Sequence, residues 1–238
     1  MTTLALPEGA SVVVVDDDPL DAKSMTHPLI DAGYHTETIS DFDSSQNADD
    51  FLALIADQYD ALVCDHILSG RSTVRFTGAE LVSKANRRAH RPLPAVLISS
   101  HVHTDQNGSI RRWLEGIPAV VDKSDLSDVV VDALDYTIAE LSGRVKRERR
   151  AFATPIEILN VQPDGEVPVA RVVVVGWRIA TSVWMPLQPI LDATGLPANQ
   201  LPGRWLEADV NCHAKNAADL FYRNIILAPD LPEGWLET

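Results

Sequence analysis

Residues 12–22 read VVVVDDDPLDA, an apolar run that passes directly into a run of acidic residues. Four consecutive valines are typical of a strand that is buried on both faces. Three aspartates then follow at positions 16–18, and like charges this close together repel one another unless a cation compensates them. Asp18 offers a simpler explanation, because it is also well placed to cap a helix that begins at Pro19. Taken alone, the acidic run is explained by a solvated turn.

The first 140 residues alternate short apolar runs with amphipathic ones. Strands are predicted at residues 11–15, 35–40, 59–65, 95–100 and 119–123. Helices are predicted at residues 18–33, 47–58, 77–89, 107–116 and 126–145. In the first helix, the spacing of Leu20, Met25, Leu29 and Ile30 predicts the buried face, and Gly33 is placed to end the helix. Strands that alternate with helices predict a parallel sheet covered on both faces.

Polar residues end four of the five predicted strands. In chain order these residues are Asp16 and Asp17, Asp65, Ser99 and Ser100, and Lys123. Because the carboxyl ends of parallel strands meet at one edge of the sheet, we expect their side chains to gather there. Oxygen-only ligands select a hard cation, and Mg²⁺ is commonly held by one or two carboxylates. The sequence therefore predicts Mg²⁺ bound by Asp16, Asp17 and Asp65.

Five stretches in this order and spacing resemble the receiver domain of two-component response regulators. They are VVVVDDDP, YDALVCD, TGAEL, VLISS and VVDK, and the resemblance covers residues 10–142. It implies a flavodoxin-like five-stranded parallel sheet and a role in a phosphorelay. The partner would be a sensor histidine kinase or a phosphotransfer protein.

The resemblance also implies a metal site. Asp17 would bind Mg²⁺ directly and Asp16 through water, with Asp65 and the backbone carbonyl of Ile67 as further ligands. An alternative alignment uses Asp17 and Asp18 as the acid pair, and the proline that follows favours Asp16 and Asp17.

The phosphoryl chemistry implied by the resemblance centres on Asp65 as the phosphoacceptor. Ser99 would hydrogen-bond the phosphoryl group, and Lys123 would pair with one of its oxygens. Beyond self-phosphorylation from a phosphodonor and autodephosphorylation, we expect no enzymatic activity of the protein. Two residues depart from the family pattern. Ser124 stands where the family usually has proline after the lysine, and Val120 stands where many members have an aromatic residue. The segment 66–76 is also longer than usual, so the usual route of signal transmission is in question.

Composition limits the remaining possibilities. Apolar residues make up 45% of the chain, which is enough for a packed core, and the net charge is −14. No apolar run is long enough to span a membrane, and the N-terminus has no signal-peptide pattern. Cys64 and Cys212 lie far apart, so we expect no disulfide framework and a cytoplasmic location.

The character of the sequence changes near Arg150. We predict a receiver domain at 1–142, a linker at 143–154 and an output domain at 155–238, smaller and either α+β or mostly β. The output domain shows four strand-like runs and one or two short helices. Residues 151–238 carry five basic and ten acidic side chains, a net of −5. Because a nucleic-acid-binding domain usually presents a basic face, DNA binding is disfavoured.

Three hypotheses remain for the output domain. The first is protein interaction or oligomerisation through tryptophans, which are favoured anchors of protein interfaces: Trp177, Trp184, Trp205 and Trp235. The second is DNA binding with the basic run at 144–150 on phosphates, although that run also suits a solvated helix end. The third is an enzymatic or ligand-binding domain, for which the sequence offers no motif.

Overall fold

The structure is a computed structural model that describes residues 5–42, 47–70, 74–100, 108–164 and 167–229. The chain divides into two compact units, Met1–Lys146 and Arg147–Thr238. The division after Lys146 lies inside the segment predicted as a linker. Among the described residues, no helix is both long and apolar enough to cross a membrane.

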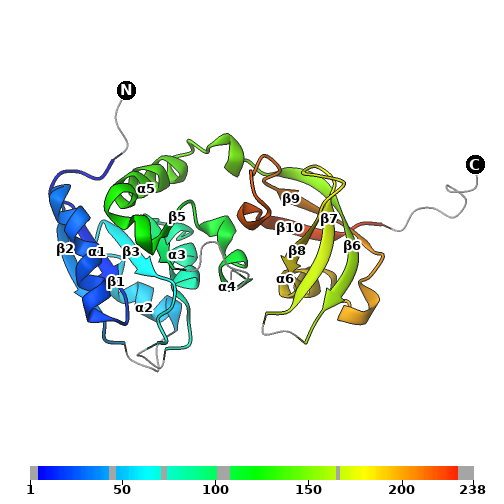
Figure 1. Cartoon of the computed structure of the whole chain (residues 1–238), viewed down its shortest axis with the longest axis horizontal. Coiled ribbons are helices and arrows are strands. Elements are labelled where there is room, and N and C mark those ends of the chain that lie inside the picture. The colour runs from blue at the N-terminus through cyan, green and yellow to red at the C-terminus, as the bar shows by residue number, and fades with distance from the viewer. Residues whose placement is uncertain (1–4, 43–46, 71–73, 101–107, 165–166, 230–238) are drawn as a thin grey trace, which may run out of the picture. The chain divides into compact units, whose positions relative to one another are not determined.

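The first unit is built on five parallel strands in the order β2-β1-β3-β4-β5 (Figure 1). The strands are β1 (Ser11–Val15), β2 (His35–Ile39), β3 (Ala61–Asp65), β4 (Ala95–Ser99) and β5 (Val120–Asp122). Their pairing is parallel throughout, as the alternation of strands and helices predicts. The unit is therefore a flavodoxin-like α/β domain, in which ligands bind beyond the carboxyl ends of the strands.

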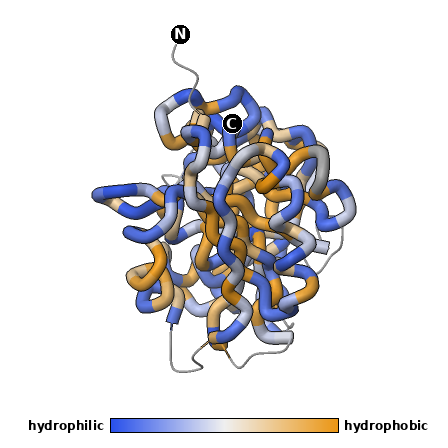
Figure 2. The backbone as a smooth tube through the Cα atoms, turned by 90° about the vertical axis from the view of Figure 1, so that its left-hand side faces the viewer, coloured by the Kyte–Doolittle hydropathy of each residue, from blue (hydrophilic) through white to orange (hydrophobic). Residues whose placement is uncertain are grey.

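Helices cover both faces of this sheet. They are α1 (Pro19–Asp31), α2 (Ala48–Ile55), α3 (Gly78–Asn86), α4 (Gly108–Arg111) and α5 (Leu126–Leu141), with short 3₁₀ turns η2 (Leu114–Gly116) and η3 (Lys123–Asp125). Helices α1 and α5 pack together over one face, where they share a core with β1, β3, β4 and β5. Helices α2 and α3 pack against each other, and α3 also contacts β3 and β4. In Figure 2 the hydrophobic segments gather toward the interior of this unit.

Two details of the predicted helices were wrong. The buried face of α1 consists of Ala22, Met25, Thr26 and Leu29, whereas Leu20 and Ile30 are 76% and 53% exposed. The small Ala22 lets α1 approach the sheet closely, and its spacing to the next buried positions has the helical period.

Helix α5 ends at Leu141 and does not continue to residue 145. Gly143 adopts φ +87° just beyond its end, and its N–H donates to the carbonyl of Glu140. This is a common way for a helix to stop, because glycine reaches the left-handed region without a Cβ clash. The basic run 144–150 therefore lies beyond α5 and includes the 3₁₀ turn η4 (Arg147–Arg149), rather than forming a helix end.

The second unit is a five-stranded antiparallel sheet in the order β10-β9-β6-β7-β8. Its strands are β6 (Phe152–Gln162), β7 (Val169–Val174), β8 (Ser182–Pro186), β9 (Trp205–Val210) and β10 (Tyr222–Leu227). The other elements are α6 (Leu187–Thr194) and the 3₁₀ turns η5 (Ala198–Gln200) and η6 (Ala217–Asp219). The sequence predicted four strand-like runs, and β8 makes a fifth.

One face of this second sheet forms a core and the other carries exposed side chains. Alternate residues of β6, β7 and β9 are buried, as expected for an antiparallel sheet with one solvated face. Leu187 and Ile190 of α6 pack into the same core as these strands. A buried asparagine, Asn211, fixes the start of the unit, because its side chain donates to the carbonyls of Glu148 and Asp219 and accepts from the N–H of Phe221.

Candidate functional site

The polar strand ends of the first unit meet in one cavity of about 290 Å³. It is lined by residues that follow β1, β3, β4 and β5, as expected for the carboxyl edge of a parallel sheet. The lining consists of Asp16, Asp17, Asp18, Asp21, Asp65, His66, Ile67, Gly70, Ser99, Ser100 and Lys123. All six residues that the sequence singled out for metal or phosphoryl chemistry are in this set.

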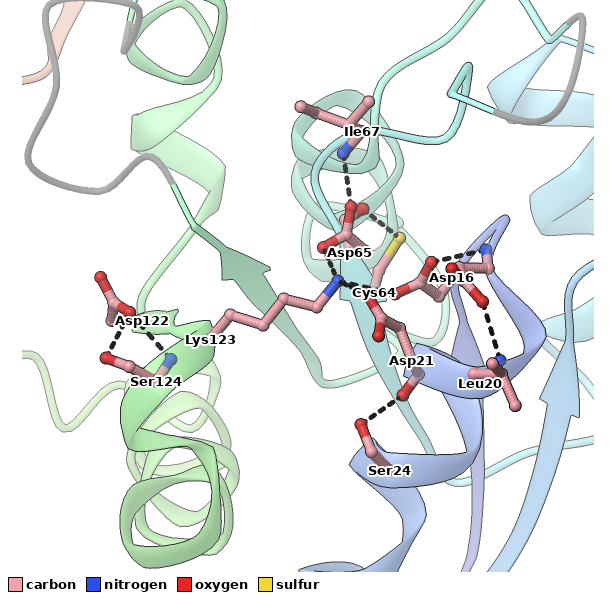
Figure 3. Close-up of polar contacts among 11 residues, drawn as sticks. Asp16, Leu20, Asp21, Ser24, Cys64, Asp65, Ile67, Asp122, Lys123 and Ser124 are labelled. Atoms are coloured by element: carbon pink, nitrogen blue, oxygen red, sulfur yellow. Dashed lines mark hydrogen bonds and ion pairs between the residues drawn. The ribbon is translucent and has the colours of Figure 1, made fainter.

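The ammonium of Lys123 lies at the centre of the carboxylates (Figure 3). Its Nζ is 3.1 Å from Asp16 Oδ2, 3.1 Å from Asp65 Oδ1 and 2.8 Å from Asp21 Oδ2. The side chains of Asp16 and Asp65 are only 2% and 9% exposed. Lys123 is therefore the cation that compensates the acidic strand ends in this structure.

Asp16 and Asp17 lie in the cavity, whereas Asp18 also caps a helix. Asp16 Oδ1 accepts the N–H of Asp18, so both oxygens of Asp16 are engaged. Asp18 caps α1 by accepting the N–H of Leu20, as the sequence predicted. Asp17 lines the cavity and approaches Gly70, where an added Cβ would lie 3.2 Å from Asp17 Oδ2. The arrangement favours Asp16 and Asp17 as the acid pair, since Asp18 serves the helix.

Burial controls the protonation of the two innermost carboxyls. Desolvation raises the pKa of Asp16 and that of Asp65, although Lys123 and backbone N–H donors pull both pKa values the other way. Burial alone would lower the pKa of Lys123, but its contacts with Asp21, Asp65 and Asp16 raise it above its usual range. The carboxylates thus keep Lys123 protonated. For Asp16 and Asp65, the rise in pKa caused by burial is larger than the fall caused by the ammonium.

The backbone around Asp65 is fixed from two sides. Asp65 Oδ2 accepts the N–H of Ile67 at 2.7 Å, which orients the carboxylate. Gly78, the first residue of α3, packs directly on the end of β3, where an added Cβ would lie 1.8 Å from the carbonyl oxygen of Asp65. Its N–H donates to the carbonyl of His66, and Thr77 caps the helix by accepting from Glu80. The TGAE stretch therefore holds Asp65 in place.

The donor set fits a hard cation by its chemistry. Asp16, Asp17 and Asp65 are all at least 90% buried and line one cavity, and Ile67 contributes its backbone beside them. Nevertheless, no group of three His, Cys, Asp or Glu side chains is arranged to hold a metal ion among the described residues. Asp16 and Asp65 each direct one oxygen at the Lys123 ammonium, so a cation bound to those same oxygens would face the charge of the ammonium.

Five lining residues are not among the predicted site residues, and Asp21 and His66 are two of them. Asp21 lies in the first turn of α1, whose start is set by the N-cap Asp18 and by Pro19. His66 follows Asp65 directly, is 6% exposed, and its Nε2 hydrogen-bonds with Ser109 Oγ at 2.8 Å. Nothing in the sequence alone pairs these two positions, which are far apart along the chain.

The positions that depart from the resembled family have local explanations. The N–H and Oγ of Ser124 both donate to Asp122 Oδ1, which caps η3, and proline would lack that N–H. Val120 lies in β5 and is only partly buried. Of the long segment 66–76, residues 71–73 lie outside the described part of the chain.

Solved structures provide the comparison with known proteins. No family model matches the chain, and no curated protein matches it either. Several of the similar solved structures are receiver domains of response regulators. The N-terminal domain of a response regulator/sensory box/GGDEF protein from Carboxydothermus hydrogenoformans is 17% identical, with a TM-score of 0.42 over 57% of this chain and 99% of that one.

Two further structures give similar values. A CheY-like receiver domain protein from Methanospirillum hungatei is 22% identical, with a TM-score of 0.39 over 55% of this chain and 98% of that one. A response regulator from Thermotoga maritima in complex with Mg²⁺-BeF is 20% identical, with a TM-score of 0.37 over 56% of this chain and 98% of that one. The strand order of the first sheet, rather than these similarities, defines its fold.

The tryptophans of the second unit differ in their surroundings. Trp177 packs against the core and its Nε1 donates to the carbonyl of Ala214, so it is a structural residue. Trp184 and Trp205 lie on the exposed sheet face and are 38% and 42% exposed. Trp235 lies outside the described residues.

The second unit also contains a groove of about 790 Å³. Trp205 lines it together with Pro155, Pro202 and Pro229, and Arg204 and Glu207 flank these apolar residues. An aromatic residue at the edge of an apolar groove is typical of surfaces that bind other proteins.

Proposed function

We propose that the first unit is the receiver domain of a response regulator and that Asp65 accepts the phosphoryl group. The observation that supports this most is the convergence of Asp16, Asp17, Asp65, Ser99 and Lys123 on one cavity at the carboxyl edge of a flavodoxin-like sheet. Phosphoryl transfer requires positioning and charge compensation more than covalent help from the protein. A cavity that joins an oriented carboxylate with cationic and hydroxyl groups meets that requirement.

In the proposed reaction, an oxygen of Asp65 attacks the phosphorus atom of a phosphohistidine. The phosphorus–nitrogen bond breaks, and its electron pair stays with the histidine nitrogen of the sensor kinase or phosphotransfer protein. Lys123 neutralises one phosphoryl oxygen, and Ser99 donates a hydrogen bond to another. The Ile67 N–H holds the attacking carboxylate in position.

Asp16, Asp17, Asp65 and the carbonyl of Ile67 would hold Mg²⁺ in this site. The ion supplies charge compensation for the phosphoryl oxygens when it is bound. Asp17 is proposed as the direct ligand, because Asp16 Oδ1 already accepts the N–H of Asp18 and Asp16 is expected to bind the ion through water.

The proposed phosphorylation is tested with acetyl phosphate and Mg²⁺ by intact-mass measurement. We expect the wild type to gain one phosphoryl group and Asp65→Asn to gain none. An Asp60→Asn variant, which changes an aspartate just before β3, serves as the matched control and should label like the wild type. Equal labelling of the wild type and Asp65→Asn contradicts the assignment.

We further propose that residues 155–238 act as an output domain for protein interaction or oligomerisation, joined through a linker at 143–154. The supporting observations are the net charge of −5 and the exposed Trp184 and Trp205 on one sheet face. We also propose a cytoplasmic location for the protein, because the cysteines Cys64 and Cys212 are free thiols, as is common in a reducing compartment. Sedimentation of the wild type, Trp205→Ala and a Trp184→Ala/Trp205→Ala double variant tests the output proposal. Tight, salt-sensitive and sequence-selective DNA binding would overturn it.

A further inference from the structure

Lys123 has one partner that the proposed chemistry does not use. Asp21 Oδ2 makes the shortest of its three ion pairs, at 2.8 Å, against 3.1 Å to both Asp16 and Asp65. The side chain of Asp21 is 49% exposed, whereas Asp16 and Asp65 are almost fully buried. Asp21 therefore contacts the ammonium from a more exposed position than the two buried carboxylates, and it reaches the ammonium from α1 (Figure 3).

The position of Asp21 is fixed by the start of α1. Pro19 is the first residue of the helix, Asp18 caps it, and the carbonyl of Asp21 accepts a hydrogen bond from Ser24 Oγ. A capped first turn with proline at its beginning holds the backbone rigidly. The carboxylate is thus kept at the cavity mouth independently of Lys123.

The other two partners of Lys123 are the carboxylates that the proposed function assigns to Mg²⁺ and the phosphoryl group. While the ammonium lies between Asp16 and Asp65, it competes with a metal for the same oxygens, because two cations close together repel one another. If the ammonium moved away from Asp16 and Asp65 and were hydrated only by water, it would have no ion pair. Asp21 offers a partner that requires only a small shift of the ammonium.

We propose that Asp21 is a positioning residue that holds Lys123 at the cavity mouth when Mg²⁺ binds Asp16 and Asp65. This inference rests on the proposed function of the site. Asp21 touches neither the metal nor the phosphoryl group in this role, and it acts on them through Lys123. The chain then keeps the lysine charged and close enough to meet the phosphoryl oxygen.

The test is Mg²⁺ affinity, measured by calorimetry on the full chain without any phosphodonor. Asp21→Asn should weaken Mg²⁺ binding by about fivefold, because Lys123 then stays on Asp16 and Asp65 and one attractive charge is lost. Asp21→Glu keeps the carboxylate and should restore affinity to within about twofold of the wild type. Asp31→Asn removes an exposed charge from the far end of the same helix and should leave affinity unchanged.

The Lys123→Met background separates the positioning of Lys123 by Asp21 from the direct effect of the Asp21 charge on Mg²⁺ affinity. Without the ammonium, Asp21→Asn should change Mg²⁺ affinity by about twofold or less, since only its long-range charge remains. An equal loss in both backgrounds overturns the positioning role, as does unchanged affinity of Asp21→Asn. Failure of the wild type to bind Mg²⁺ overturns the metal site of the proposed function and this inference with it, and is a distinct result.

Discussion

Replacing Lys123 by methionine tests whether its ammonium compensates the buried acids. Methionine keeps most of the apolar stem but removes the charge that faces Asp16 and Asp65 at 3.1 Å each. Breaking a fully buried ion pair costs about 3–5 kcal/mol. Because the Lys123 side chain is 24% exposed, we expect a smaller loss of about 2–3 kcal/mol in the free energy of unfolding at pH 7.5 without divalent ions.

The loss should depend on pH in a defined direction. Burial already raises the pKa of Asp16 and of Asp65 in the folded chain, and removing Lys123 raises both further. A carboxyl whose pKa is higher in the folded chain than in the unfolded chain holds its proton more tightly when folded. As pH rises toward the folded pKa, ionisation of this carboxyl therefore lowers the free energy of unfolding. The destabilisation by Lys123→Met should therefore shrink as pH falls through the raised pKa values, and Asp16→Asn should partly relieve it at pH 7.5.

Urea unfolding at pH 7.5 and pH 5 provides the measurement. Asn211→Ala, which removes three hydrogen bonds within the second unit, identifies that unit's contribution to the unfolding curve. A Lys123→Met variant as stable as the wild type at pH 7.5, or equally destabilised at both pH values, would refute the reasoning that the ammonium compensates these carboxylates.

Two further predictions concern the same site. Asp17→Asn should weaken Mg²⁺ binding more than Asp16→Asn, by about tenfold or more, because Asp17 is proposed as the direct ligand; calorimetry decides, and the reverse order would favour Asp16. Gly78→Ala should lower the free energy of unfolding by about 2–3 kcal/mol, because the added Cβ would overlap the carbonyl of Asp65. Gly70→Ala should lower the free energy of unfolding by less, because the nearest atom to its added Cβ is 3.2 Å away. Urea unfolding checks the pair, and equal stability of the two variants would contradict this packing.

The fold of the first unit was predictable because four of its five strands contain continuous apolar runs, whereas β2 was predicted from its alternation. Val12 to Val15 are fully buried, as four adjacent valines in a parallel sheet should be. The second unit was harder. Strand β8 passes directly into α6 at Pro186, so no turn separates the two elements. Its alternation of buried Val183 and Met185 with exposed Trp184 is too short to stand out.

The lining residues at the strand ends were predictable for a related reason. Polar residues at the carboxyl ends of parallel strands must share an edge, whatever the details of the loops. The partners of Lys123 were not predictable in the same way, because ion-pair geometry depends on how α1 is set against β5. Asp21 and Lys123 are distant in sequence, and only the folded chain brings their charges within 2.8 Å.

Asp65 is proposed to carry the phosphoryl group, and chemical marking of the phosphorylated residue would locate that group. The wild type is treated with acetyl phosphate and Mg²⁺, the acyl phosphate is reduced with borohydride to mark its position, and the peptides are sequenced by mass spectrometry. We expect a single marked residue, Asp65. A mark on Asp16, Asp17 or Asp18, or on no residue of this cavity, would contradict it.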